Sequence, residues 1–198
     1  MSDSIMCSLT ERISMILLTR GIRDWVFLDP EEVRSLYQGP PPLDRLMQKL
    51  NPNISHLIML ANFSNHHYLI VVSRDHSYVS IYDSLNTGRH FVCDERFVRQ
   101  TRAVLEKIFP SIYFNFQFFF SSMAPRAADE GIMLLVYMIG LFNSRISNHL
   151  YRVEATLCGN LAVSYWRQLL AKMCCRGPGG NMIAPLNPFD AELLKALI

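Results

Sequence analysis

The stretch His66-His67-Tyr68-Leu69-Ile70-Val71-Val72, HHYLIVV in one-letter code, decides the fold of this chain. All of the residues that follow the two histidines are aromatic or aliphatic, and most of these are β-branched. Residues of these types fit a pleated, buried surface, so the sequence predicts a β-strand over residues 68–73. The neighbouring segments determine which sheet this strand joins.

Similar segments flank this strand on both sides. Residues 78–82 are also rich in β-branched and aromatic residues, residues 55–60 are mostly apolar, and Ser73-Arg74-Asp75-His76 has the composition of a hairpin turn. Further along, residues 112–120 form an aromatic, strongly β-prone run that predicts a buried strand. Together these segments predict a central β-sheet.

Helical apolar spacing occurs before and after the strands. One helix has explicit ends, because Asp29 is a good N-cap, Pro30 suits the first helical position and Gly39-Pro40-Pro41-Pro42 ends it. The predicted helices cover residues 8–19, 30–37, 44–50, 91–109, about 131–142 and about 158–175. This order of elements predicts an α+β fold with a central mixed β-sheet flanked by helices.

The composition is that of one globular domain in a reducing compartment. The chain has 198 residues, half of them hydrophobic, and a formal net charge of +2 from scattered basic residues. We therefore expect no nucleic-acid partner and no membrane partner. The sequence also has no glycine-rich loop of the kind that cradles phosphates, and we expect no cofactor. The cysteines are odd in number and form no C-x-x-C pair, which predicts an intracellular protein of the nucleus or cytoplasm without a metal site.

The sequence divides near residue 176. Residues 1–176 are predicted to form the folded domain, and residues 177–198 a Gly/Pro linker followed by a short amphipathic tail. On that tail Leu193, Leu194 and Leu197 would form an apolar face. Such a face packs on its own domain or binds a groove on a partner, and both alternatives stay open.

Three short motifs stand in order along the chain. His66 and His67 begin the central strand, the next strand ends in Tyr82-Asp83-Ser84-Leu85, and Asp129-Glu130-Gly131 precedes the apolar run 132–142. These motifs resemble the H-W-x-L-x-V, Y-D-S-L and D-C-G segments of the cysteine proteases that cleave SUMO and other ubiquitin-like proteins. The adenoviral protease is similar to that family. The resemblance implies a papain-like fold of the ubiquitin-like-protease type.

The resemblance extends over residues 13–173. A segment that begins at Trp25 is similar to the family's W-L-x-D-x-x-V segment, and residues 165–169 are similar to its closing helix. In the family a groove holds the extended C-terminal tail of a ubiquitin-like protein. The resemblance therefore implies a protein partner, either a ubiquitin-like protein or a subunit of a complex, and the residues expected to contact it are His66, His67, Trp25 and Glu130.

The chemistry of the family needs a cysteine at the position of Glu130. A thiol at a helix start is activated by the helix dipole and by an imidazole that a carboxylate orients. His66 and Asp83 match the imidazole and the carboxylate, but Glu130 cannot serve as an efficient acyl acceptor, and Ala124 replaces the family's oxyanion glutamine. The resemblance thus implies a pseudoprotease that acts as a protein-binding or scaffold module, with Glu130 paired to protonated His66.

Plainer interpretations of the two matching residues stay open. A histidine in a half-buried strand is often a hydrogen-bonded polar residue without a catalytic origin, and Asp83 could cap the turn that follows its strand. His67 is an alternative match to the family's histidine, although only His66 keeps Leu69 and Val71 in register.

Other nucleophiles would give a different function. Cys158 opens a predicted helix, where a thiol pKa is lowered, and it would make the chain an active thiol isopeptidase or deSUMOylating protease. Ser121-Ser122 is a weaker alternative, and Gln117 is a weak candidate for a displaced oxyanion donor. A purely structural subunit that binds through its tail is the third candidate function.

Overall fold

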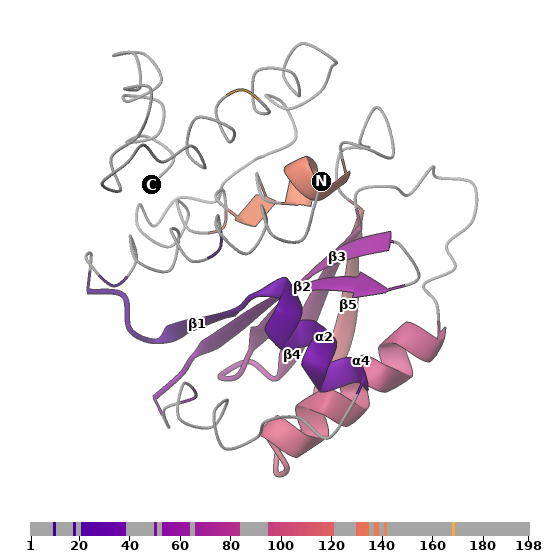
Figure 1. Cartoon of the computed structure of the whole chain (residues 1–198). Helices are drawn as coiled ribbons and strands as arrows, with labels where there is room; N and C mark the ends of the chain where they lie inside the picture. Colours follow the sequence, from indigo (N-terminus) through magenta and orange to yellow (C-terminus); the bar gives the residue numbers. More distant parts are fainter. Residues whose placement is uncertain are drawn as a thin grey trace.

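The computed structural model of the chain describes residues 10, 18, 21–38, 50, 53–63, 66–83, 95–120, 130–134, 137, 138, 141 and 168 (Figure 1). Its elements are β1 (Trp25–Leu28), α2 (Pro30–Gln38), β2 (His56–Phe63), β3 (His66–Ser73), β4 (Tyr78–Asp83), α4 (Glu95–Ile108) and β5 (Asn115–Phe120). Helices pack against a five-stranded sheet, which confirms the predicted α+β class.

The strands lie in the order β1-β2-β3-β4-β5. The three central strands are antiparallel neighbours, whereas β1 pairs with β2 and β5 pairs with β4 in parallel. A parallel neighbour needs a crossover connection, and α2 and α4 lie in the two crossovers. The sheet is therefore mixed, as the sequence predicts, and the turn between β3 and β4 covers residues 74–77.

The start of α2 is fixed by two reciprocal caps. The Asp29 side chain accepts hydrogen bonds from the backbone N–H groups of Glu31 and Glu32, both at 2.9 Å. In return, the Glu32 carboxylate accepts a hydrogen bond from the Asp29 N–H at 3.1 Å. The predicted N-cap at Asp29 is confirmed, and the helix runs one residue further than predicted, to Gln38.

One face of the sheet packs against α2 and α4 (Figure 1). The stripe that α4 buries consists of Phe97, Thr101, Val104, Leu105 and Ile108. Alternate strand residues meet it, and these are Leu57, Met59, Ala61, Tyr68, Ile70, Val72, Val79 and Ile81. Apolar residues repeat every two positions in the strands and about every 3.6 positions in the helix, so the two apolar faces pack together as one core.

The opposite face of the sheet is apolar as well. The strand residues that alternate with the first core include Ile58, Leu60 and Leu69, each at most 1% exposed. Tyr137, in the helical segment described from Glu130 onward, stacks on Tyr82 with the ring centroids 6.0 Å apart. The buried residues of that segment are Ile132, Met133, Leu134, Tyr137 and Met138. This agrees with the predicted core helix.

Some boundaries differ from the sequence-based expectation. The strand β1 is too short to produce a periodic pattern, and it is extended because it pairs in parallel with β2. The strand β5 begins at Asn115, three residues later than predicted. The predictions that lie largely or wholly outside the described residues are the helices at 8–19, 44–50 and about 158–175, the boundary near 176 and the tail.

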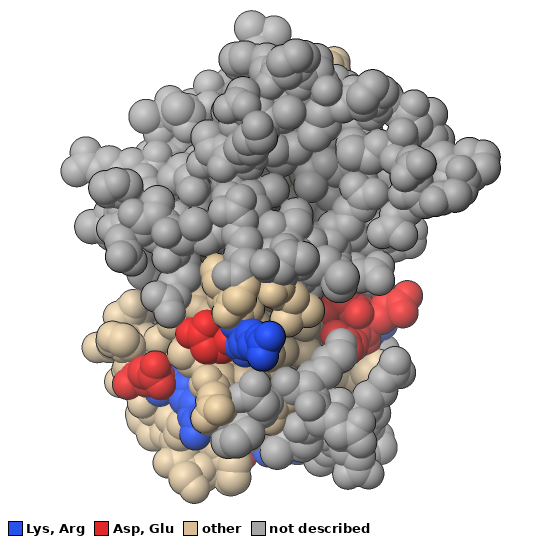
Figure 2. Space-filling model, turned by 90° about the vertical axis from the view of Figure 1, so that its left-hand side faces the viewer, with Lys and Arg blue, Asp and Glu red and all other residues tan. Residues whose placement is uncertain are grey.

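The described surface carries charges of both signs. In the view of Figure 2, the Lys and Arg side chains of the described part lie among Asp and Glu side chains and do not gather into one basic area. Among the described residues, no helix combines the length and the apolar character that crossing a membrane requires.

Candidate functional site

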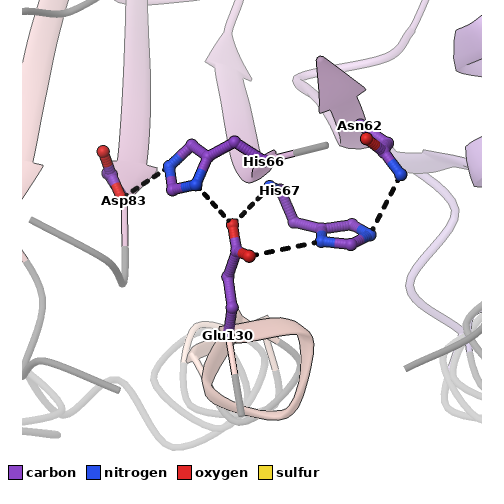
Figure 3. A network of polar contacts seen from close by, with 5 residues as sticks. All are labelled: Asn62, His66, His67, Asp83 and Glu130. Carbon is purple, nitrogen blue, oxygen red and sulfur yellow. Dashed lines mark hydrogen bonds and ion pairs between the residues drawn. The ribbon is translucent and has the colours of Figure 1, made fainter. Parts of the chain in front are cut away.

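Three segments bring polar side chains together at one end of the sheet (Figure 3). His66 is the first residue of β3, and Asp83 is the last residue of β4. Tyr68 pairs with Asp83 across these antiparallel strands, so the His66 side chain, two residues from Tyr68, lies on the same face as Asp83. Glu130 projects toward the two histidines from the helical segment, which lies below them in Figure 3.

His66 lies between two carboxylates. Its Nε2 atom is 2.9 Å from Asp83 Oδ1, and its Nδ1 atom is 2.8 Å from Glu130 Oε1. A carboxylate only accepts hydrogen bonds, so both ring nitrogens carry a proton and the ring is an imidazolium. Burial by itself would lower the pKa of His66, but the hydrogen bonds and charges of Asp83 and Glu130 outweigh it and raise the pKa to about 9.

Glu130 is a buried carboxylate held by both histidines. Its side chain is 5% exposed, and Oε1 also accepts a short hydrogen bond from the backbone N–H of His67. Its other oxygen, Oε2, lies 3.5 Å from His67 Nδ1. Burial by itself would raise the pKa of Glu130, but the hydrogen bonds from His66 and His67 outweigh it and lower the pKa to about 2. Glu130 is therefore ionised at neutral pH.

Asn62 supports the second histidine. It lies directly opposite His67 in the register of β2 and β3, with Asn62 Nδ2 3.3 Å from His67 Nε2. Because His67 Nδ1 faces a carboxylate, that nitrogen carries a proton, and Nε2 then accepts a hydrogen bond from the Asn62 amide. The Asn62 side chain thus favours the tautomer of His67 that donates to Glu130.

Aromatic rings hold His66 from the core side. Its ring is nearly perpendicular to the Tyr68 ring, with the centroids 4.4 Å apart, and Tyr68 stacks on Phe97 of α4 at 4.2 Å. Phe63, at the end of β2, also packs on Phe97. The first apolar core therefore fixes the orientation of His66 before any partner is bound.

His66 and Asp83 have the geometry of the histidine and the carboxylate of a catalytic triad. In such triads a carboxylate orients one ring nitrogen of a histidine, and the other nitrogen faces the nucleophile. Asp83 and His66 have this relation, and Glu130 occupies the position that faces Nδ1. The ion pair between Glu130 and protonated His66, which the sequence leads us to expect, is formed.

Trp25 is not brought to this site. It pairs with His56 at the start of β2, whereas His66 pairs with Phe63 at the other end of the same strand. At about 3.3 Å per residue, the two ends of β2 lie roughly 23 Å apart. Trp25 stacks instead on His56, with the ring centroids 4.7 Å apart. A contact of Trp25 with a partner remains a prediction that this site does not support.

The remaining sequence candidates fall into two groups. Gly131 is buried next to Glu130, and Gln117 is exposed on β5, on a different strand from the site. The candidates outside the described residues are Asp129, Ala124, Ser121-Ser122, Cys158, Leu193, Leu194 and Leu197. Among the residues that the structure describes, no group of three His, Cys, Asp or Glu residues forms a metal site.

Sequence reasoning missed the role of Asn62. Both Asn62 and His67 lie in the link between the predicted strands 55–60 and 68–73, and only the observed register, in which β2 and β3 extend into this link, pairs them. Sequence reasoning named His67 as a residue expected to contact a partner and as an alternative match to the family's histidine, but not as a donor to Glu130. Its contact with Glu130 depends on the approach of a segment 63 residues away, which no local pattern predicts.

Solved structures with this architecture include SUMO proteases and an effector protein bound to ubiquitin. The SUMO protease Ulp1, with its catalytic cysteine oxidised to a sulfenic acid, superimposes with a TM-score of 0.65 at 14% identity, covering 88% of this chain and 76% of that one. The Ulp1-like SUMO protease catalytic domain of Chaetomium thermophilum gives 0.60 at 16% identity, covering 96% and 76%. The Xanthomonas campestris effector XopD, bound to ubiquitin, gives 0.62 at 15% identity, covering 86% and 89%.

The chain has the fold of the ubiquitin-like proteases. No protein-family model and no curated protein sequence matches it. This chain is only 14 to 16% identical to these three proteins, so the similarity between them is one of fold, that is, of the arrangement of helices and strands. The resemblance read from the motifs is therefore confirmed for the fold.

Proposed function

We propose that this chain is a pseudoprotease, a protein-binding module with a ubiquitin-like-protease fold that does not cleave its partner. The observation that carries the proposal is the Glu130 carboxylate, buried and ionised, in the position that faces His66 Nδ1. A carboxylate with a pKa of about 2 is a weak nucleophile toward an amide.

The state of His66 supports the same conclusion. A general base must have an unprotonated nitrogen at the working pH, and the ideal catalytic pKa lies near that pH. Both nitrogens of His66 donate to carboxylates, and the raised pKa of about 9 keeps both protons in place at neutral pH. The imidazolium of His66 is thus held in an ion pair, and neither ring nitrogen is available to accept a proton from a nucleophile.

The kind of partner is suggested by the similar structures. One of them is the Ulp1 protease domain in complex with Smt3, the yeast ortholog of SUMO, and another is XopD bound to ubiquitin. We therefore propose a ubiquitin-like protein, or a subunit of a complex, as the partner. The cysteine pattern supports an intracellular location in the nucleus or cytoplasm.

The first experiment measures binding and cleavage side by side. SUMO and ubiquitin, each with a short C-terminal extension, are titrated into the purified chain by calorimetry and incubated with it for cleavage. We expect saturable binding of at least one of them without hydrolysis. Hydrolysis that disappears in Cys158→Ala would overturn the proposal in favour of a thiol protease with a displaced nucleophile. Binding of neither protein would overturn the proposed partner.

A second experiment asks whether the nucleophile is the only missing group. Glu130→Cys alone should stay inactive, because Ala124 leaves the oxyanion without its expected side-chain donor. Glu130→Cys combined with Ala124→Gln should gain hydrolysis of the extended substrates. The matched control is Glu130→Ala combined with Ala124→Gln, which has the donor but no thiol. Robust cleavage by the single variant would contradict this account.

A further inference from the structure

The groups around Glu130 form a site for a carboxylate, whichever molecule supplies it. Three donors converge there from the start of β3, namely His66 Nδ1, the His67 backbone N–H and His67 Nδ1 (Figure 3). Two of them point to Oε1 of Glu130 and the third points to Oε2. Several N–H donors, one of them charged, aimed at both oxygens of one carboxylate make a strong anion site.

Residues other than Glu130 hold these donors in place. Asp83 holds His66 from the opposite ring nitrogen, and Asn62 holds His67 in the same way. The His67 N–H belongs to a strand that pairs with β2 on one side and β4 on the other. Loss of the Glu130 side chain would therefore leave the donors oriented toward a buried space without their acceptor, which is a costly state.

We propose that the start of β3 is a carboxylate-binding cradle and that Glu130 is its built-in ligand. The ligand class is a small monocarboxylate or the carboxylate of a chain end, because the donors match two oxygens on one carbon. The inference uses the site of the proposed function, and its consequence for a partner rests on that function. In the native protein, Glu130 closes the cradle to the carboxylate at the end of a partner's chain.

The test uses formate, the smallest carboxylate, and Glu130→Ala, which empties the cradle and suits a helix. Thermal unfolding is followed in sodium formate and in sodium chloride of equal ionic strength. We expect formate to raise the Tm of Glu130→Ala by about 2 to 4 °C over chloride, with saturation. The wild-type protein and the isosteric Glu130→Gln, whose cradles are filled, should show no difference between the salts.

Two further variants identify the donors. Glu130→Ala with His67→Leu removes one ring donor and should lose most of the formate effect. Glu130→Ala with His76→Leu is the matched control, because His76 is exposed in the turn between β3 and β4 and contacts Ser73. It should keep the full effect. If the His67→Leu variant also keeps it, the assignment of the cradle is wrong.

The remaining outcomes decide the proposal as well. Equal formate effects on wild type and Glu130→Ala, or none on Glu130→Ala, would overturn it. If Glu130→Ala does not fold, Glu130→Ser is measured in its place and the same criteria apply. Formate binding needs neither partner nor cleavage, so this test can fail while the pseudoprotease proposal stands, and the reverse is also true.

Discussion

The sheet has a histidine-containing polar cluster at each end, and the two are built in different ways. The carboxylate cluster consists of Asn62, His66, His67, Asp83 and Glu130, and the strand corner consists of Asp24, Ser55 and His56. In the corner the Asp24 carbonyl accepts backbone N–H bonds from both Ser55 and His56, at 2.8 and 3.1 Å. In the carboxylate cluster, by contrast, His66 and His67 contact Glu130 through its carboxylate.

This difference determines what each cluster can do. The strand corner would keep its backbone bonds if a side chain were removed, so it serves to join the starts of β1 and β2. The carboxylate cluster joins distant segments by charged side chains, and loss of one partner leaves another charge buried. Such charges are costly without partners and are typical of functional sites. The following predictions test this contrast, beginning with the largest effect.

Replacing His66 should destabilise the protein most. In His66→Ala the buried Glu130 carboxylate loses its charged partner, and Asp83 loses the same cation. Removal of one member of a buried ion pair typically costs about 3 to 5 kcal/mol, and we expect the lower end because His66 and Asp83 are 19% and 26% exposed. The loss in the free energy of unfolding is measured by urea unfolding. His76→Leu is the control and should change stability by less than about 0.5 kcal/mol. A loss from His66→Ala as small as that of the control would contradict the contrast.

The carboxylate cluster should also give the protein a stability maximum in mildly acidic solution. The pKa of His66 rises from 6.5 to about 9 on folding, so its contribution is complete below pH 6.5 and is lost as pH rises through 9. The pKa of Glu130 falls from 4.5 to about 2, so its contribution is present above pH 4.5 and is lost as pH falls through 2. Both are complete between pH 4.5 and 6.5.

We expect a decline of about 2 kcal/mol in the free energy of unfolding between pH 6.5 and 9, measured in urea. Glu130→Gln removes one of the two carboxylates that raise the pKa of His66, so its decline over the same range should be clearly smaller. Parallel profiles for the two proteins would show that His66 and Glu130 do not titrate as a pair.

The two ends of the sheet also differ in how far the sequence predicts them. The meeting of His66, Asp83 and Glu130 was predicted from the resemblance of three motifs to the segments of the ubiquitin-like proteases that carry a catalytic triad. The same resemblance named Trp25 with His66 and Glu130 as a residue expected to contact a partner, and the register of β1 and β2 puts Trp25 at the far end of the sheet. A motif names a residue type and an element, whereas the register that decides which residues meet comes from tertiary pairing.

At the strand corner, Ser55→Ala should cost about 1 kcal/mol. The variant loses the 2.6 Å hydrogen bond from the Ser55 hydroxyl to Asp24 Oδ2, and also its contact with His56, but the backbone bonds to the Asp24 carbonyl remain. Urea unfolding measures the loss. NMR titration of His66 should give the same pKa as in the wild type, since the corner lies at the other end of β2. A shifted His66 titration would mean that the two clusters are coupled.

Asn62→Leu should have the smallest effect on stability, about 0.5 kcal/mol, because its 3.3 Å contact with His67 is exposed to water. Its effect on the cradle should be larger than its effect on the fold. Without the Asn62 amide, His67 is free to place its proton on Nε2, and Nδ1 then presents a lone pair to the carboxylate. Combined with Glu130→Ala, Asn62→Leu should therefore weaken formate binding several-fold while the melting temperature in chloride barely changes. Equal formate affinity with and without Asn62 would show that this residue does not set the tautomer of His67 and is an ordinary surface contact.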